Sequence, residues 1–201
     1  MGNACLTWGA VNQEKSILPI HKIKYAMYRL TILFLLCGLL TGPINAQNDD
    51  SASKVATEDA IIATLYDVIS GPVGEARDWD LMRYLFHEDA RLMAMGRDQE
   101  GQPRMISMTV DEYIDRNGPY FEENGFFEEE LSRKTDRFGR IVQIFSTYAS
   151  RRTADGPIYQ RGINSIQLVQ KDGRYYIVNI LWNAEYDDNP IPKRYLRKRK
   201  K

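Results

Sequence analysis

The chain has 201 residues, of which 43% are hydrophobic and 11% aromatic, so it can fill one core but not two. Its formal net charge is zero, but basic residues gather at the two ends, which leaves residues 47–192 with 16 basic and 26 acidic residues. This body has a net charge of −10 and argues against nucleic acid as a partner, because neutralising phosphates requires a basic face.

Both cysteines lie near the start of the chain, at Cys5 and Cys37. The remaining residues therefore form no disulfide among themselves, and they offer no thiol nucleophile and no thiolate metal ligand. Neither oxidation nor cysteine chemistry is expected to hold the fold.

An apolar run over residues 30–40 follows Arg29 and precedes a short segment that ends at the small residue Ala46. A run of this length is too short to span a bilayer but is typical of a signal-peptide core. The sequence therefore predicts a signal peptide over residues 1–46 and an exported protein, either periplasmic or secreted.

The start of the protein is open to two interpretations. Translation from Met27 leaves a signal of ordinary length and makes residues 1–26 an upstream extension, whereas translation from Met1 includes them. In either case residues 47–56, which follow the expected cleavage point, are polar and predict a flexible leader.

Helical spacing of apolar residues begins after Thr57, which is suited to cap a helix. A second, short helix is expected to begin near Asp78 and a third at Thr109. Helices first and a long-stranded sheet second predict an α+β domain over residues 57–187. The expected strands cover residues 90–95, 104–108, 126–134, 139–151, 159–171 and 174–185.

Residues 188–201 form a tail that contains two prolines and ends in a basic run. The prolines end the last strand, and Tyr195 and Leu196 are expected to dock back onto the body. The basic run has two interpretations, a solvated chain end or a contact with anionic surfaces.

The stretch from Ile163 to Trp182 alternates its side chains on both sides of an Asp-Gly pair. A two-residue loop of this kind closes a hairpin, so Lys171 pairs with Arg174 and, continuing outward, Ile163 pairs with Trp182. Directly paired residues share a face of the sheet. The face predicted to point inward consists of Ile163, Ser165, Gln167, Val169, Tyr176, Val178, Ile180 and Trp182.

The opposite face of this hairpin is half apolar and rimmed by amides, which makes it too apolar to face water alone. It predicts a homodimer formed through the outer face of the sheet. On the preceding strand, the inward set is predicted to be Val142, Ile144, Ser146 and Tyr148.

Helices at the start, a Phe86–Ala90 step into the first strand, and long final strands that end at Asn179–Trp182 together resemble the nuclear transport factor 2-like superfamily. The resemblance covers residues 57–187 and implies a cone-shaped α+β barrel, in which a strongly curved, mainly antiparallel sheet wraps on N-terminal helices. The segments STYASRR, RGINSIQL and WNAEYDDNPIPKRYL resemble a small bacterial branch of unassigned activity within this superfamily, whose cone fold is also SnoaL-like and steroid-isomerase-like.

Four functional residues of the steroid isomerases of this superfamily can be compared with the residues at the matching positions of this sequence. The resemblance places their phenol donor on Tyr66 and their pocket tryptophan on Trp182, but their carboxylate base on Ala94 and their second oxyanion donor on Ser165. Because a methyl group cannot accept a proton, the isomerase mechanism is rejected, while the pocket is retained.

The inward set and the resemblance together predict a pocket for a small apolar or amphipathic molecule, lined by Tyr66, Tyr148, Ser165, Gln167 and Trp182. No cofactor is predicted. A metal site is not predicted either, because His87, Glu88 and Asp89 are adjacent and need distant ligands to enclose an ion.

Three functions remain open. The first is an exported binding or accessory protein without chemistry, because the base position holds Ala94. The second is an isomerase, cyclase or dehydratase whose base is His87 or one of Glu128, Glu129 and Glu130. The third is a protein-interaction or dimerisation module whose cavity is filled by its own side chains. A titratable side chain that reaches the cavity favours the enzyme.

Overall fold

The computed structural model describes residues 50–196 of the chain. The helices in this range are α2 (Asp50–Ser53), α3 (Glu58–Ile69), α4 (Trp79–Leu85), α5 (Val110–Asn124) and the 3-10 helix η1 (Lys193–Tyr195). The strands are β1 (Phe86–Arg97), β2 (Pro103–Met108), β3 (Phe127–Phe138), β4 (Ile141–Arg151), β5 (Gln160–Lys171) and β6 (Arg174–Ala184). The predicted signal peptide and the basic run at 197–201 lie outside the described residues.

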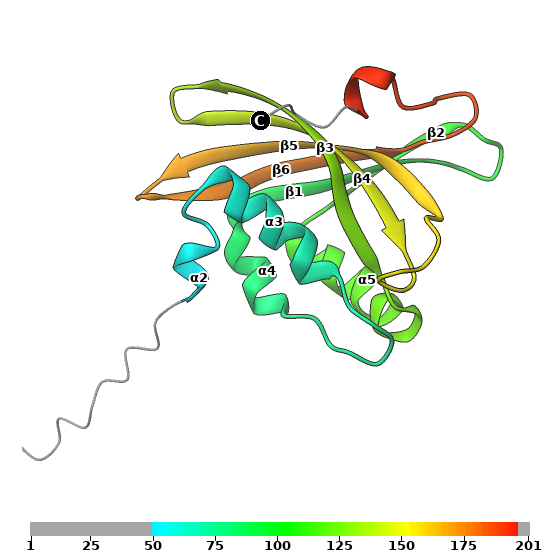
Figure 1. Cartoon of the computed structure of the whole chain (residues 1–201), viewed down its shortest axis with the longest axis horizontal. Helices are drawn as coiled ribbons and strands as arrows, with labels where there is room; N and C mark the ends of the chain where they lie inside the picture. Colours follow the sequence, from blue (N-terminus) through cyan, green and yellow to red (C-terminus); the bar gives the residue numbers. More distant parts are fainter. Residues whose placement is uncertain (1–49, 197–201) are drawn as a thin grey trace, which may run out of the picture. The chain divides into compact units, whose positions relative to one another are not determined.

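All six strands belong to one sheet with the order β2-β1-β6-β5-β4-β3. Strands β1 and β6 are parallel, and the other neighbouring strands are antiparallel. The sheet is curved without closing on itself, and α3, α4 and α5 lie against its concave side (Figure 1). The predicted α+β class, with a mainly antiparallel sheet wrapped on helices, is confirmed.

Local signals explain where the helices begin and end. Thr57 accepts a hydrogen bond from the amide of Ala60 at the start of α3. Thr109 and Glu112 form a reciprocal capping box at the start of α5, and Gly125 ends that helix with a φ of 67°, which favours glycine. No helix within residues 50–196 is long and apolar enough to cross a membrane.

The core lies between these helices and the concave face of the sheet. Alternate residues of β4, β5 and β6 point into it, and the helices contribute apolar residues at helical spacing. The largest completely buried side chains include Ile61, Ile62, Met82, Leu85, Ile144, Ile166, Leu168 and Ile177. The inward set predicted for β4, which ends in Ser146 and Tyr148, is confirmed.

The hairpin between β5 and β6 has the predicted turn but not the predicted register. Asp172 and Gly173 have φ values of 53° and 79°, as a two-residue hairpin turn requires, and Lys171 pairs with Arg174. Farther along, the register shifts between Gln167 and Leu168, so that Gln167 pairs with Asn179. One residue of β6 is left over, which is a β-bulge.

The bulge corrects the predicted inward face. Next to the turn, Leu168 and Ile177 point inward instead of Val169 and Tyr176. Beyond the bulge, Trp182 pairs with Asn164 instead of Ile163. The extra residue shifts the alternation of β6 by one position, so Trp182 shares its face of the sheet with Asn164. The prediction that Ser165 and Trp182 share a face is therefore wrong. The inward residues of β5 are Gly162, Asn164, Ile166 and Leu168.

Both ends of the described chain pack against the sheet domain. Val55, within the predicted flexible leader, is completely buried and its carbonyl accepts a hydrogen bond from Tyr175, so the folded body begins before residue 57. At the other end, the ring of Tyr195 stacks on Phe145 with a centroid distance of 5.6 Å. Its carbonyl accepts a 2.7 Å hydrogen bond from Thr147. Residues 188–196, which we call the C-terminal strap, thus contact the convex face.

Candidate functional site

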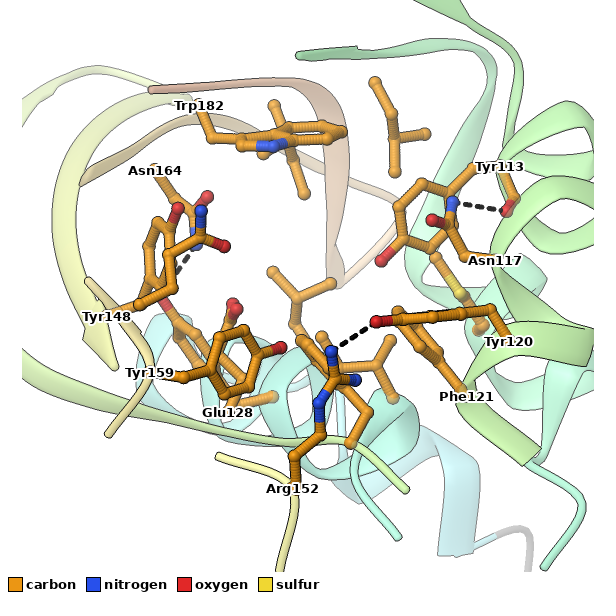
Figure 2. A pocket seen from close by; sticks show the side chains of 18 residues that line it. Tyr113, Asn117, Tyr120, Phe121, Glu128, Tyr148, Arg152, Tyr159, Asn164 and Trp182 are labelled. Atoms are coloured by element: carbon orange, nitrogen blue, oxygen red, sulfur yellow. Dashed lines mark hydrogen bonds between the residues drawn. The ribbon is translucent and has the colours of Figure 1, made fainter. Parts of the chain in front are cut away.

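A cavity of about 290 Å³ lies between the helices and the concave face of the sheet. Figure 2 shows aromatic and polar side chains from α5, β3, β4, β5 and β6 arranged around it. Its volume is at the lower end of the range in which proteins bind small organic molecules. The apolar part of the wall is formed by Leu65, Ile69, Met82, Leu92, Phe121, Phe126 and Ile180.

Three of the five predicted site residues line this cavity, and two do not. Tyr66, Tyr148 and Trp182 are on the wall. Ser165 lies on the other face of the sheet, where it accepts a hydrogen bond from Gln143, and Gln167 is exposed. The β-bulge explains the error, because it leaves Asn164 and not Ser165 on the face of Trp182. Asn164 lines the cavity.

Glu128 brings a carboxylate to the cavity wall. It pairs with Ser150 across β3 and β4, and the Ser150 hydroxyl donates a 2.9 Å hydrogen bond to Oε2 of Glu128. Burial raises the pKa of Glu128 to about 7, although hydrogen bonds from Ser150 and Asn164 oppose the rise. The residue keeps a partly accessible surface because it faces the cavity.

The other two glutamates of this segment have different roles. Glu129 is exposed and forms a 2.7 Å ion pair with Arg151. Glu130 forms an ion pair of 2.6 Å with Arg133 and accepts a 2.5 Å hydrogen bond from Ser146. Neither lines the cavity. Of the three glutamates that the sequence offered as a base, Glu128 is thus the one at the site.

A chain of hydrogen bonds leads away from the cavity through Tyr66. The Asn164 amide donates to the Tyr66 hydroxyl at 3.1 Å, and that hydroxyl lies 2.7 Å from the Ser146 hydroxyl. Since Ser146 donates its proton to Glu130, Tyr66 must donate to Ser146. The Tyr66 proton is therefore already in use, and this residue fixes Asn164 more than it serves a ligand.

Two other phenols are free to serve a ligand. The hydroxyls of Tyr113 and Tyr148 border the cavity and form no hydrogen bond with another residue of the described range 50–196. Burial, together with the nearby Glu128, raises the pKa of both tyrosines, so both stay protonated donors near neutral pH. Figure 2 shows them on opposite sides of the cavity, Tyr113 on α5 and Tyr148 on the sheet.

His87 is not part of this site. It is partly buried at the start of β1, where its ring lies 6.0 Å from that of Tyr176, and it does not line the cavity. The ligand atoms of His87, Glu88 and Asp89 lie within 4.8 Å of one another. Glu88 and Asp89 are exposed, however, and exposed acidic groups often lie close together without an ion.

Arg152 lies at the edge of the cavity between two tyrosines. Its guanidinium carbon is 5.0 Å from the ring centroid of Tyr120 and 4.5 Å from that of Tyr159. It also donates hydrogen bonds to the Tyr120 hydroxyl and to the carbonyl of Gly125. Figure 2 shows the guanidinium directed toward the cavity from the strand end of β4.

No protein-family model matches the chain, and no curated protein matches its sequence. Solved structures are similar to it. A variant of Rv3472, a protein of unknown function from Mycobacterium tuberculosis, is 16% identical with a TM-score of 0.50, and the match covers 75% of this chain and 81% of that one. An NTF2-like protein of unknown function from Shewanella baltica is 12% identical with a TM-score of 0.45, covering 73% and 100%.

The domain shares its fold with Rv3472. The helices on the concave side of a curved sheet are the arrangement that the resemblance implied, so the sequence prediction of the fold is confirmed. At such low identity the similarity of this domain to other proteins concerns the fold alone. One scaffold supports many functions, and the chemistry must be argued from the residues of this chain.

Sequence reasoning missed Asn164 and Tyr113 among the residues of the cavity, and it did not single out Glu128. Asn164 was assigned to the outer face, because no local signal places the bulge in β6. Tyr113 was expected in the third helix, but its position over the sheet depends on how that helix packs. Glu128 was one of three adjacent glutamates, and alternation alone places Glu128 and Glu130 on the same face. Their surroundings differ along the strand, because Glu128 meets Ser150 at the cavity, whereas Glu130 meets Ser146 and Arg133.

Proposed function

We propose that this domain is an enzyme that transfers a proton on a small apolar or amphipathic molecule, with Glu128 as the acid-base group. The observation that carries the proposal is a single carboxylate on the wall of a mostly apolar cavity. Within residues 50–196, Glu128 is the one acidic side chain that lines it. Of the three functions left open by the sequence, the second, with its base among residues 128–130, is therefore favoured.

The surroundings of Glu128 suit this chemistry. Its pKa of about 7 leaves a sizeable ionised fraction at neutral pH and makes the carboxylate a stronger base than an exposed glutamate. Apolar side chains around it lower the local dielectric constant, which strengthens electrostatic interactions inside the cavity. Tyr113 and Tyr148 supply phenolic donors for a negative charge that develops on a substrate oxygen.

The reaction that fits these groups begins at a carbon beside a carbonyl. Glu128 takes a proton from this carbon, and the electrons of the C–H bond move toward the carbonyl oxygen, which becomes an enolate. A tyrosine hydroxyl donates a hydrogen bond to this oxygen. The protonated Glu128 then returns the proton to another carbon of the same conjugated system, which completes an isomerisation. Where the β-carbon carries a hydroxyl group, the protonated Glu128 instead donates its proton to that hydroxyl, and the enolate expels it as water, which is a dehydratase reaction.

Hydrogen-deuterium exchange tests this proposal without knowledge of the natural substrate. Cyclohexenone, acetophenone and β-tetralone are incubated with the protein in D₂O, and deuterium at the carbon beside the carbonyl is followed by NMR. We expect the wild type to accelerate exchange of at least one compound, and Glu128→Gln to reduce the accelerated rate by about 100-fold or more. Glu129→Gln, which removes the neighbouring exposed charge, is the matched control.

Two results would contradict the proposal. Exchange that is unchanged by Glu128→Gln would show that another group moves the proton. Binding of these compounds in the cavity, detected by quenching of Trp182 fluorescence, without exchange in any of them would favour a binding protein without chemistry. That outcome would favour the first of the three functions, a binding or accessory protein without chemistry.

Two further expectations belong to this proposal. The first is export, either to the periplasm or outside the cell, which the apolar run at 30–40 supports. The second is a homodimer through the convex face of the sheet. It is supported by apolar side chains in a groove on that face, namely Met95, Phe145, Ile163, Leu181 and Ile191. Sedimentation of dilute protein tests the dimer, and a monomer at all concentrations would remove it.

A further inference from the structure

Arg152 is the cationic side chain at the cavity, and its environment keeps it available. It lines the cavity together with Tyr120 and Tyr159, whose rings hold the guanidinium by cation-π contacts. Its hydrogen bonds go to the hydroxyl of Tyr120 and the carbonyl of Gly125. A guanidinium has five N–H groups, so some of them remain free to bind a further acceptor.

The charge of Arg152 is not balanced by a carboxylate of the described chain. Six of the thirteen other arginines of residues 50–196 form ion pairs with acidic side chains, and these include the adjacent Arg151, which pairs with Glu129. Arg152 has no such partner in that range, although residues 47–192 carry a net charge of −10. An unpaired guanidinium is thus kept at the cavity of an acidic body.

Arg152 and Glu128 line the same cavity but do not pair with each other. The carboxylate of Glu128 is engaged by Ser150 and Asn164, and Arg152 is held by the tyrosines at the edge. Figure 2 shows the two charged groups on the wall, with the apolar interior and Trp182 beyond them. The cavity therefore contains a carboxylate that can accept a proton and, separate from it, a guanidinium that can bind an anion.

We propose that the ligand of this cavity carries a carboxylate, which binds to the guanidinium of Arg152 while its apolar body occupies the space toward Trp182. The proposal rests on the proposed function and narrows its substrate class to small carboxylic acids. A guanidinium forms two parallel hydrogen bonds with a carboxylate, and such charge-assisted bonds are among the strongest in proteins. Fixing the carboxylate at Arg152 also orients the remaining carbon atoms relative to Glu128.

Paired probes test the charge without a known ligand. Benzoate, 4-phenylbutyrate and 2-naphthoate are compared with their neutral primary amides by titration calorimetry at pH 7 and low salt. We expect at least one acid to bind the wild type about 10- to 100-fold more tightly than its amide. Arg152→Gln should remove this preference and leave binding of the amide within about twofold. The preference should also weaken as salt is raised.

Matched variants separate the site from general charge effects. Arg151→Gln removes the neighbouring arginine, which is paired with Glu129, and should keep the preference for the acid. Arg152→Lys keeps the charge but loses the planar set of N–H donors. It should retain only part of the preference for the acid. Binding of the amide by Arg152→Gln shows in the same experiment that the variant is folded and that its cavity is intact.

Several outcomes would overturn the inference. Equal affinity for acids and amides across all three pairs would show that the cavity does not select an anion. A preference that survives in Arg152→Gln would place the anion elsewhere. Absence of binding by all six compounds would contradict the inference together with the proposed ligand cavity. A preference for acids that depends on Arg152, without proton exchange in any carbonyl compound, would instead sustain the inference and contradict the proposed enzyme.

Discussion

Glu128 lowers the stability of the fold when it is ionised, and this cost is a feature of many functional sites. Its pKa is about 7 in the folded protein and 4.5 in an unperturbed side chain, mainly because burial disfavours the charged form. The folded state therefore holds the proton more tightly than the unfolded state. Stability from this group is present at low pH and is lost as pH rises from about 4.5 through about 7.

Glu128→Gln should therefore stabilise the protein in a pH-dependent way. At pH 8 we expect the free energy of unfolding to rise by about 1–2 kcal/mol, which is below the full value for such a shift because the side chain is partly accessible. At pH 4.5 the gain should nearly disappear. Urea unfolding at both pH values measures this gain, and Glu129→Gln is the control. Equal stabilisation at both pH values would contradict the burial of the Glu128 carboxylate.

A second residue-scale prediction concerns Gly162, which lets the Tyr148 side chain cross β5. A Cβ atom at this position would overlap the Tyr148 hydroxyl and lie 2.5 Å from the carbonyl oxygen of Asn183. Gly162→Ala should lower the free energy of unfolding by about 1–3 kcal/mol. It should also weaken binding in the cavity, because Tyr148 must move.

Urea unfolding and Trp182 fluorescence report these two effects. Gly96→Ala is the control, because a Cβ atom there meets no other atom within 4 Å. Equal stability of Gly162→Ala and Gly96→Ala would show that the close approach at β5 is easily relieved.

At the scale of elements, the bulge in β6 and the placement of α5 decide which side chains meet at the cavity. The bulge turns Trp182 to the face of Asn164. Helix α5 brings Tyr113 to the opposite wall, where its ring lies 6.2 Å from that of Trp182 at an angle of 90°. The two elements thus form one aromatic contact on the wall of the cavity, and neither element alone provides it.

The capping box of α5 should contribute measurably to this arrangement. Thr109 accepts a hydrogen bond from the Glu112 amide, and Glu112 accepts one from the Thr109 amide at 2.7 Å. Thr109→Ala should lower the free energy of unfolding by about 1 kcal/mol, because an amide at the helix start loses its partner. Thr109→Ser keeps the cap and should stay near the wild type in thermal unfolding. A loss equal to that of Thr109→Ala would contradict a capping role.

At the scale of the molecule, the C-terminal strap shields part of the convex face. Ile191 is buried, its amide donates to Glu185, and Tyr195 covers Phe145 and accepts from Thr147. Without the strap, the hydroxyl of Thr147 loses its partner and apolar side chains of β4, β5 and β6 become accessible. The strap therefore links the end of the chain to the stability and the association of the domain.

Removal of residues 188–201 should expose this face. We expect a loss of at least about 1 kcal/mol in the free energy of unfolding and increased self-association in sedimentation. Removal of residues 197–201 alone keeps the strap and serves as the control. If both shortened proteins sediment and unfold like the full chain, the strap does not protect the convex face.

The sequence by itself determined the features that depend on neighbouring residues. Thr57 and Thr109 cap helices, Asp172 and Gly173 form the hairpin turn, and alternation along β4 places Tyr148 inward. These signals act within a few residues, so they can be read along the chain. The α+β class follows from their order.

Only the tertiary structure decided the composition of the site. Both faces of β5 and β6 are apolar enough to be buried, so the sequence could not show that a bulge puts Asn164 inward and Ser165 outward. Likewise, packing of the strands and helices selects Glu128 among three adjacent glutamates and leaves Arg152 unpaired while Arg151 is paired. These choices depend on contacts between distant segments, for which a single sequence carries no local signal.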